Sequence, residues 1–389
     1  MTEAVIVSAV RTPIGVSYKG ALRDVPAEDL AALVVSEALS RSGVSAGLVD
    51  DVILAEELYG GGDTARHAAN AAGLQHVPGQ SINRHCAGGL TAIGNAAASI
   101  KAGMDRAVIA GGVQSSSTAP QTAWREAGSG EYVPGLRPTF PYTEDANDDV
   151  TLSVGWNVAQ QVGITREEMD AWALRSHQRA VAAIDAGTFD DEIVPVKVSQ
   201  ADGSVIEFAV DEQPRRGSTA EKLASLRGLH PEIDGFSITA GNASGINDAG
   251  AAVMVVSEEL AAEQGLTPLA KVRAWAAIGV DPRLTGMGGV EVIPRVLERA
   301  GIGIDDVDLW EINEAFASVP VAACKVLGID EATVNVHGSG CSLGHPVGAS
   351  GARMVTTLVH ELKRRGGGIA VAAMCAAGGQ GGAVVIEVF

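Results

Sequence analysis

Apolar residues along the chain fall into short continuous runs that alternate with segments of helical spacing. The runs predict buried strands, at 4–10, 106–110, 251–256, 307–312 and 369–374. Between the runs, apolar residues recur every three to four positions, which predicts helices with one face toward a sheet. Strands that alternate with helices predict mostly parallel sheets with helices on both faces.

One stretch of this pattern occurs twice, which indicates an internal repeat. ALSRSGV at 38–44 leads to DDVIL at 50–54, and VLERAGI at 296–302 leads to DDVDL at 305–309. Each copy predicts an amphipathic helix ended by a glycine, an acidic turn and a buried strand. Chance similarity in a chain rich in alanine and glycine is the alternative. The repeat predicts two similar α/β units packed side by side.

The segment 115–239 interrupts this rhythm, with prolines at 120, 134, 138 and 141 near its beginning. One helix is expected within it, at 166–186, because Thr165 followed by Glu168 forms a capping box. We therefore predict an insertion between the two halves that lies over the site as a lid.

Composition and charge limit the classes of partner. A chain of 389 residues is longer than one built around a single hydrophobic core, which predicts more than one structural unit. The formal charge of −19 argues against nucleic acid and against an anionic membrane surface as partners. No apolar run reaches the ~18 residues that span a bilayer. Four cysteines without paired spacing predict no disulfide framework and a cytoplasmic location. Without Cys-x-x-Cys or His-x-x-x-His spacing, no metal site is expected.

Two cysteines stand beside glycine-rich turns. Cys86, in NRHCAGGL, precedes a predicted helix, where free backbone N–H groups and the helix dipole favour a thiolate. Cys375, in MCAAGGQGG, follows a buried strand, and the glycines there allow a ligand to approach the backbone. The alternative for each is a small buried hydrophobic residue. Cys324 is expected to be structural, in helix packing, and the role of Cys341 stays open.

A histidine and an asparagine occur at positions suited to the same chemistry. Pro346 holds His345 extended just before a predicted helix. Asn313 follows the strand at 307–312, at the end where α/β sheets build their sites. The alternatives are a helix-capping histidine and an ordinary N-cap asparagine. Two thiols and an imidazole supply a nucleophile, a base and an acid, which suits carbon–carbon bond chemistry on thioesters.

From end to end the chain resembles the thiolase family. The motifs occur in the family's order: VIVSAVRTPIG, NRHCAGGL, DEQPR, TAGNASGIND, GVDPR, NEAFA, GHPVGASGAR and CAAGGQG. The resemblance implies a five-layered α/β/α/β/α fold of two similar halves. It implies an N-terminal half at 1–116, continued by about 245–264, an inserted loop domain at 117–244 and a C-terminal half at 265–389.

The resemblance also implies roles for the motif residues. Cys86 is expected to be the nucleophile that takes the acyl group, and His345 to activate it. Asn313 is expected to hold a water that, with His345, binds the thioester oxygen of the second substrate. Cys375 is expected to move the α-proton of that substrate. The backbone N–H groups of Cys86 and Ala377 are expected to form the other oxyanion site.

The implied activity is reversible acyl transfer between coenzyme A thioesters, with acyl-CoA and coenzyme A as partners and no further cofactor. Arg215 and Ser244 are expected to contact coenzyme A, and the family assembles as homodimers or homotetramers. Thr151 and Thr285 stand where related short-chain sites have methionines, so a differently lined acyl pocket is expected. Acyl length, branching and physiological direction stay open.

Three other classes share parts of the pattern. Decarboxylating ketosynthases use a Cys-His-His set and hydroxymethylglutaryl-CoA synthases use a glutamate base. The motifs around Asn313 and Cys375 argue against both. A thiolase-like protein that binds coenzyme A or lipid without turnover is expected to lack one of the four motif residues, and all four are present here.

Overall fold

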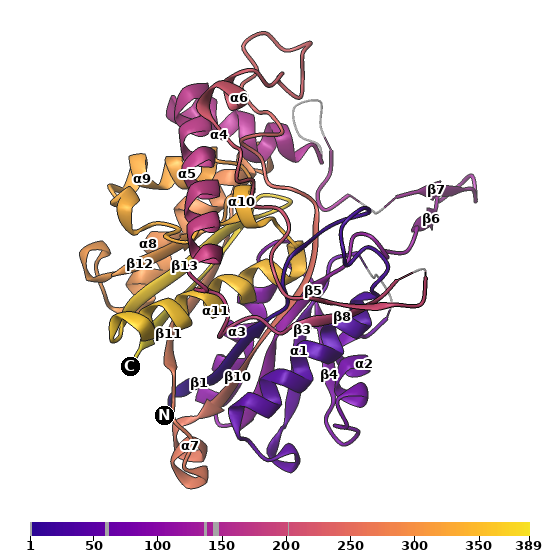
Figure 1. Cartoon of the computed structure of the whole chain (residues 1–389), viewed down its shortest axis with the longest axis vertical. Helices are drawn as coiled ribbons and strands as arrows, with labels where there is room; N and C mark the ends of the chain where they lie inside the picture. The colour runs from indigo at the N-terminus through magenta and orange to yellow at the C-terminus, as the bar shows by residue number, and fades with distance from the viewer. Residues whose placement is uncertain (1, 59–61, 136–137, 143–147, 201) are drawn as a thin grey trace.

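The two halves of the chain contain a similar series of elements (Figure 1). The structure is a computed structural model that describes residues 2–58, 62–135, 138–142, 148–200 and 202–389. The first half contains β1 (Ala4–Arg11), β2 (Gly15–Val16), α1 (Ala27–Ser42), β3 (Asp51–Ala55), α2 (Thr64–Ala71), β4 (Gly79–Ile82), α3 (Gly88–Lys101), β5 (Ala107–Gln114), β10 (Asn247–Ser257) and α7 (Glu258–Gln264). The second half contains β11 (Ala270–Gly279), α8 (Gly288–Ala300), β12 (Leu309–Ile312), α9 (Ser318–Leu327), α10 (Gly340–Leu343), α11 (Val347–Arg365), β13 (Gly368–Ala376) and β14 (Gln380–Val388).

Equivalent strands of the two halves pair in the same way. They form one sheet in the order β12-β13-β14-β11-β1-β10-β5-β3-β4, with β2 beside β10. In the first half β3 is parallel to β5, and β5, β10 and β1 are successively antiparallel. In the second half β12, β13, β14 and β11 repeat this pattern. The equivalent strands β1 and β11 pair with each other, at Val5–Lys271 and Ile6–Ala270. The repeat inferred from the sequence is confirmed.

The prediction of mostly parallel sheets is wrong. Parallel pairing joins β3 to β4 and β5, and β12 to β13, while the other pairings described in the large sheet are antiparallel. The strands β1, β5 and β10 are buried along their whole length. A strand buried on both faces is apolar throughout whatever the direction of its neighbours, so its sequence indicates burial and not direction.

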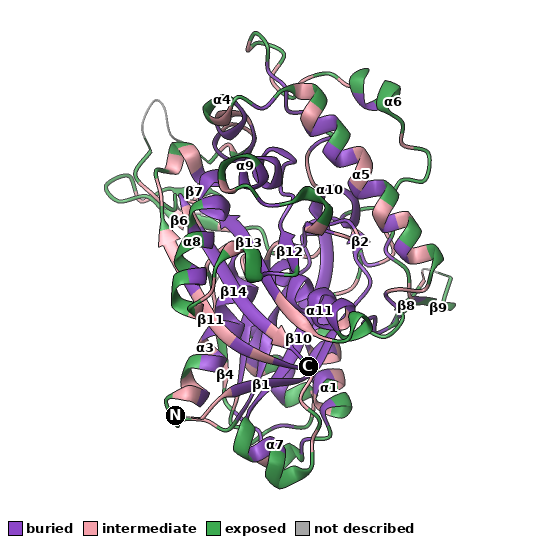
Figure 2. Ribbon diagram, turned by 90° about the vertical axis from the view of Figure 1, so that its left-hand side faces the viewer, coloured by how far each residue is buried: buried purple, intermediate pink, exposed green. Residues whose placement is uncertain are grey.

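Helices divide the protein into five layers. α1 and α2 cover the outer face of the first half, and α8, with α9 packed against it, covers the outer face of the second. α3 and α11 lie between the halves, because each contacts strands of both. Hydrophobic cores fill the spaces between these layers. In Figure 2 most strands of the large sheet are buried, and the outer helices expose one face. The α/β/α/β/α fold implied by the resemblance is confirmed.

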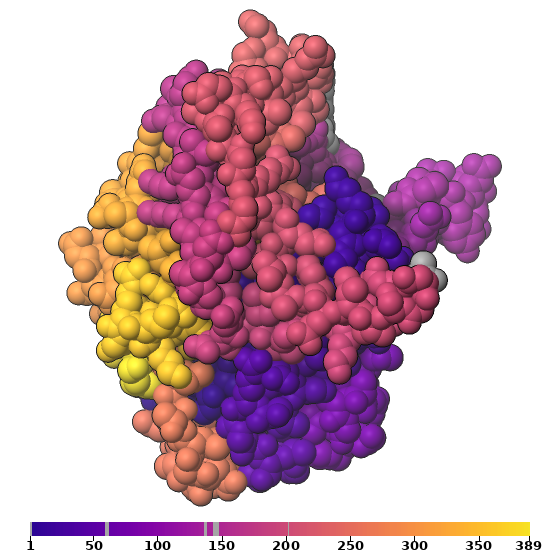
Figure 3. All heavy atoms as spheres, viewed as in Figure 1, coloured from indigo at the N-terminus to yellow at the C-terminus, as the bar shows by residue number. Residues whose placement is uncertain are grey.

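Between β5 and β10 the chain forms smaller elements outside the layers. They are β6 (Ala123–Arg125), β7 (Tyr132–Pro134), the short π-helix η2 (Thr151–Trp156), α4 (Asn157–Val162), α5 (Arg166–Asp185), β8 (Val196–Ser199), β9 (Val205–Phe208) and α6 (Ala220–Ala224). The β6–β7 hairpin projects from the body in Figure 3. α5 begins with the expected capping box of Thr165 and Glu168. Within the described ranges, no helix is long and apolar enough to cross a membrane.

A buried ion-pair network ties this inserted segment to β1. Arg11 Nε donates to Glu192 Oε1 at 2.5 Å, and its two terminal nitrogens donate to Asp211 at 2.8 and 3.0 Å. Asp211 also accepts from the backbone N–H of Ile14 at 2.7 Å. Breaking such a pair typically costs ~3–5 kcal/mol, because it leaves an uncompensated buried charge. The network therefore fixes the inserted segment on the first half.

α3 and α11 cross at glycines, which brings their N-terminal ends together. A Cβ atom on Gly89 would lie 2.8 Å from a backbone nitrogen of α11, and one on Gly351 would lie 2.5 Å from a backbone nitrogen of α3. Neither position can carry a side chain unless the helices move apart, because the interior is close-packed. Cys86 and His345 lie just before the two helices, and both line one cavity.

We expect Gly351→Ala to lower the free energy of unfolding by ~1–3 kcal/mol, the usual cost of overpacking. Alanine is the better helix former by ~1 kcal/mol, so a loss would report the crossing and not the helix itself. The matched control is Gly47→Ala, because a Cβ atom added to Gly47 would have no other atom within 4 Å. Denaturant unfolding of both variants checks this, and equal stabilities would contradict it.

Candidate active site

A cavity of about 410 Å³ lies where α3 and α11 begin and where β3 and β13 end. It brings together residues from distant parts of the chain, among them Cys86, Ser244, His345, Cys375 and Ala377. Valine, leucine, isoleucine and phenylalanine side chains form much of the remaining wall. A few polar groups converging in an apolar cavity is the usual form of a small-molecule site.

Cys86 lies just before α3 and is partly buried in this cavity. Burial, followed by the charge of Glu57 and by the neighbouring Cys375 thiol, raises the pKa of the Cys86 thiol well above its ordinary value. The backbone N–H groups of Ala377 and of Cys86 itself act in the opposite direction and lower this pKa. The shift of the Cys86 pKa is therefore opposite to the one that the helix start alone favours.

His345 is buried just before α11, with its tautomer set by a serine. Its Nδ1 atom lies 2.6 Å from Ser350 Oγ, and the Ser350 hydroxyl donates to the Pro346 carbonyl oxygen at 2.8 Å. Ser350 Oγ therefore accepts from Nδ1–H, which leaves Nε2 unprotonated. Burial, and then the charge of Arg353, lowers the pKa of His345 to about 4. At neutral pH the imidazole is an uncharged base, and it does not cap α11, whose N-cap is Pro346.

Asn313 follows β12 and is completely buried beside His345. Its Nδ2 atom lies 3.4 and 3.5 Å from the two ring nitrogens. Its Oδ1 atom is buried without a hydrogen-bond partner among the described residues. The alternative of a helix cap is excluded, because α9 begins at Ser318 with Ala317 as its N-cap. Cys324 is buried within α9, as expected for a structural cysteine.

The neighbouring Glu314 is also buried and ties α5 to the second half. Its Oε1 atom accepts from Trp172 Nε1 and Asn335 Nδ2, both at 2.8 Å. Its Oε2 atom accepts from Ser176 Oγ at 2.6 Å and from the backbone N–H of Cys341 at 3.1 Å. Cys341 thus belongs to a buried network that supports the turn holding Asn313, a role that the sequence left open.

Cys375 lies in β13, next to the turn that leads into β14. Burial raises the pKa of its thiol to about 12. Gly378 and Gly379 form the turn with φ of 77° and 74°, which glycine adopts at little cost. The Gly379 N–H donates to Thr285 Oγ1 at 3.1 Å, and Thr285 donates to the Pro282 carbonyl oxygen at 2.8 Å. Thr285 therefore braces the Cys375 turn and is not among the described residues that line the cavity.

The residues expected to contact coenzyme A and the acyl chain lie at different depths. Ser244 and Thr151 line the cavity, whereas Arg215 is exposed on the surface. Thr151 Oγ1 donates to Asp149 Oδ1 at 2.6 Å and lies 2.9 Å from His230 Nε2. The hydroxyl of Thr151 is therefore held in a polar cluster at the cavity wall. The binding roles of Ser244, Thr151 and Arg215 stay predictions.

Glu57 and His85 are residues beside the cavity that sequence reasoning missed. Glu57 lines the cavity, and its Oε1 atom lies 3.0 Å from His85 Nδ1. Glu57 lies two residues beyond the end of β3, and its place near the carboxyl end of a buried strand is the signal that could have found it. His85 directly precedes Cys86 and has a φ of 45°, uncommon for a residue other than glycine.

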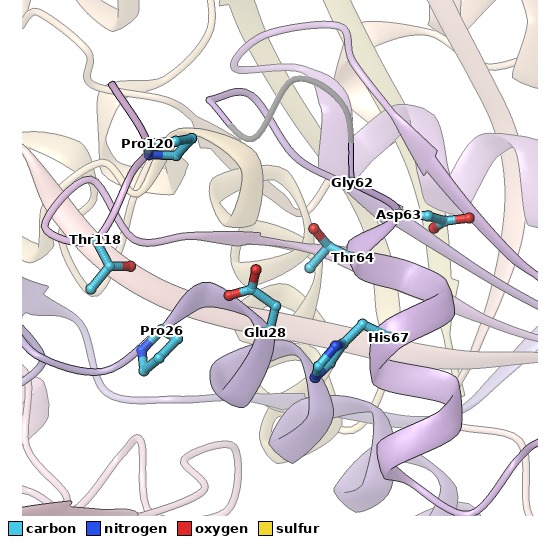
Figure 4. A pocket seen from close by; sticks show the side chains of 8 residues that line it. All are labelled: Pro26, Glu28, Gly62, Asp63, Thr64, His67, Thr118 and Pro120. Carbon is cyan, nitrogen blue, oxygen red and sulfur yellow. The ribbon is translucent and has the colours of Figure 1, made fainter. Parts of the chain in front are cut away.

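A surface hollow of about 550 Å³ lies beside the N-terminal ends of α1 and α2 (Figure 4). Glu28 and His67 contribute to its wall, but Asp63 caps α2 and Thr64 donates to Glu56 at 2.6 Å. No cluster of side chains suited to a metal ion is found in the described part of the chain. The hollow contains none of the predicted site residues.

Both halves of the chain match known families. Residues 4–259 match the family described as "Thiolase, N-terminal domain", and residues 266–388 match "Thiolase, C-terminal domain". The acetyl-CoA acetyltransferase of Cupriavidus necator is 42% identical over 405 residues, with the whole of both chains covered. The 3-ketoacyl-CoA thiolase of Bacillus subtilis is 42% identical over 402 residues, again with the whole of both chains covered.

The fold agrees with these sequence similarities. The crystal structure of the Bacillus anthracis acetyl-CoA acetyltransferase superposes with a TM-score of 0.91 at 41% identity. The match covers 100% of this chain and 99% of that one. The chain therefore belongs to the thiolase family of acyltransferases.

Proposed function

We propose that this thiolase transfers acyl groups between coenzyme A thioesters through an acyl-enzyme on Cys86. The observation that carries the proposal is one cavity lined by the Cys86 thiol, the neutral imidazole of His345 and the second thiol of Cys375. Relatives named acetyl-CoA acetyltransferase and 3-ketoacyl-CoA thiolase support coenzyme A thioesters as the substrate class.

In the first half-reaction, His345 Nε2 takes the proton of Cys86 while the sulfur bonds the acyl carbonyl carbon. The bond from that carbon to the coenzyme A sulfur breaks, and Cys375 gives its proton to the departing sulfur. The backbone N–H groups of Cys86 and Ala377, both of which act on the Cys86 sulfur, are proposed to bind the oxygen on the attacked carbon. One thioester replaces another of similar energy, so the acyl-enzyme forms reversibly.

In the second half-reaction, the Cys375 thiolate takes the α-proton of a second acyl-CoA. A thiol whose pKa is raised to about 12 gives a strongly basic thiolate, which suits a weakly acidic C–H group. The resulting enolate attacks the acyl carbon on Cys86, whose sulfur leaves and regains its proton from His345. The unpaired, buried Asn313 Oδ1 is suited to hold a water that stabilises the enolate oxygen together with His345.

Coenzyme A is proposed to contact Ser244 at the cavity wall and Arg215 at the surface. Thr151 would contact the acyl chain directly. Thr285 would affect the acyl pocket indirectly, by holding the turn that follows Cys375. The two thiols, the imidazole, two backbone N–H groups and a water held by Asn313 supply every proton and oxyanion contact in this scheme, so the proposed reaction uses no metal or organic cofactor. Assembly as a homodimer or homotetramer is part of the proposal.

We expect acetyl-CoA to leave an acetyl group on Cys86, detected by intact-mass and peptide analysis. Cys86→Ser should abolish the adduct and lower turnover by orders of magnitude, since serine is nearly isosteric but a far weaker nucleophile at this site. Cys324→Ala is the control, because its sulfur is buried in α9, away from the cavity. An adduct confined to another cysteine would overturn the assignment.

The rate of the first half-reaction should fall only at unusually low pH. His345, with a pKa of about 4 rather than the ordinary ~6.5, stays unprotonated as the pH falls through 6. The rate of coenzyme A release in the first half-reaction should therefore stay level from neutral pH to about pH 5, wherever circular dichroism shows an intact fold. A limb centred near ~6.5 would contradict a buried neutral imidazole as the base.

Cys375→Ala should separate the two half-reactions. The burst of coenzyme A release from acetyl-CoA should persist, more slowly because the proton donor is lost. Exchange of the acetyl methyl protons with heavy water should drop sharply. Asn313→Ala should also slow this exchange, because the variant loses roughly 3 kcal/mol of enolate stabilisation, the scale of one oxyanion contact. Undiminished exchange in Cys375→Ala would assign the proton transfer to another base.

A further inference from the structure

The cavity wall carries a carboxylate that the acyl-transfer scheme does not use. Glu57 lines the cavity with Cys86, and its charge acts on the Cys86 thiol. Among the described lining residues it is the single carboxylate, set in a mainly apolar wall. Its side chain is 17% exposed, so the carboxylate is largely removed from bulk water.

His85 fixes the orientation of the Glu57 carboxylate. Glu57 Oε1 lies 3.0 Å from His85 Nδ1, and His85 Nε2 lies 3.0 Å from Thr139 Oγ1. Thr139 in turn packs against Gly378 in the Cys375 turn. Both ring nitrogens of His85 are thus engaged, so the histidine has no further donor for a ligand. Glu57 Oε2 has no hydrogen-bond partner among the described residues and remains an acceptor.

An acyl chain carried by Cys86 has to share this cavity with Glu57. A plain alkyl chain would strip water from the carboxylate and return no hydrogen bond, which weakens binding. A chain with a hydroxyl group would donate to Oε2 and replace the lost water. A chain with a carboxylate would bring two negative charges together in an apolar cavity.

We propose that Glu57, held by His85, is a specificity-determining residue that favours acyl groups bearing a hydroxyl and rejects acyl groups bearing a carboxylate. This inference rests on the proposed acyl transfer at Cys86. The rival role for Glu57 is purely structural, as the partner that stabilises the unusual backbone of His85.

The test uses four-carbon thioesters of nearly equal size: butyryl-CoA, 3-hydroxybutyryl-CoA, 4-hydroxybutyryl-CoA and succinyl-CoA. The readout is the rate of coenzyme A release in the first half-reaction, with the adduct on Cys86 confirmed by mass. At least one hydroxyl-bearing chain should react about 10-fold faster than butyryl, and succinyl about 10-fold slower, within the range that single pocket contacts supply. Acylation at equal rates by all four would overturn the inference and leave acyl transfer intact. Acylation by none of the four while acetyl-CoA still acylates Cys86 would also overturn the inference, whereas failure of acetyl-CoA as well would overturn the proposed function.

Substitutions separate specificity from structure. Glu57→Val should reverse the preference so that butyryl reacts fastest. Glu57→Gln removes the charge but keeps an acceptor for the hydroxyl. It should therefore lose the discrimination against succinyl-CoA and keep the preference for hydroxyl-bearing chains. The matched control is Glu56→Gln, because Glu56 bonds the Thr64 hydroxyl and is not among the residues that line the cavity. If Glu57→Val slows all four thioesters by the same factor, Glu57 has only the structural role and the inference is wrong.

Discussion

The close crossing of α3 and α11 is the constraint on which the rest of the site depends. Cys86 precedes one helix and His345 the other, and the two helices come from opposite halves of the chain. Their backbones meet without side chains at Gly89 and Gly351, where a Cβ atom would fall within 3 Å of the other helix. The internal repeat thus places two equivalent helices in the central layer, and their close approach at the glycines brings the proposed nucleophile and its proposed base to one cavity.

Burial is the largest cause of the pKa shifts of both Cys86 and His345. The helix start and two N–H groups favour a thiolate on Cys86, but removal from water and the nearby negative charges outweigh them. The same burial keeps His345 neutral, with help from the buried Arg353, which is paired with Glu311 at 2.8 Å. A neutral thiol and a neutral imidazole develop charge only as the reaction proceeds. In the proposed reaction the backbone N–H groups of Cys86 and Ala377 would therefore stabilise the transition state more than the resting site.

The sequence predicted the parts of this structure that local pattern controls. The repeat, the capping box at Thr165 and the buried strands follow from spacing alone, and the motifs selected Cys86, His345 and Cys375, which share the cavity. Strand direction could not be predicted, because strands buried on both faces carry no sign of their neighbours' direction. The protonation state of Cys86 depends on burial by distant segments, and Thr285 meets the Cys375 turn only through tertiary packing.

Glu57 extends the same argument to substrate choice. A carboxylate near a nucleophilic sulfur opposes formation of the thiolate, so by itself it slows the first step. That cost falls when the acyl chain donates a hydrogen bond to the carboxylate, because the donor draws negative charge away from the sulfur. Binding and activation are then coupled through one side chain. A chain without a donor leaves both the carboxylate unsatisfied and the thiol harder to ionise, so discrimination arises in the chemical step as well as in binding.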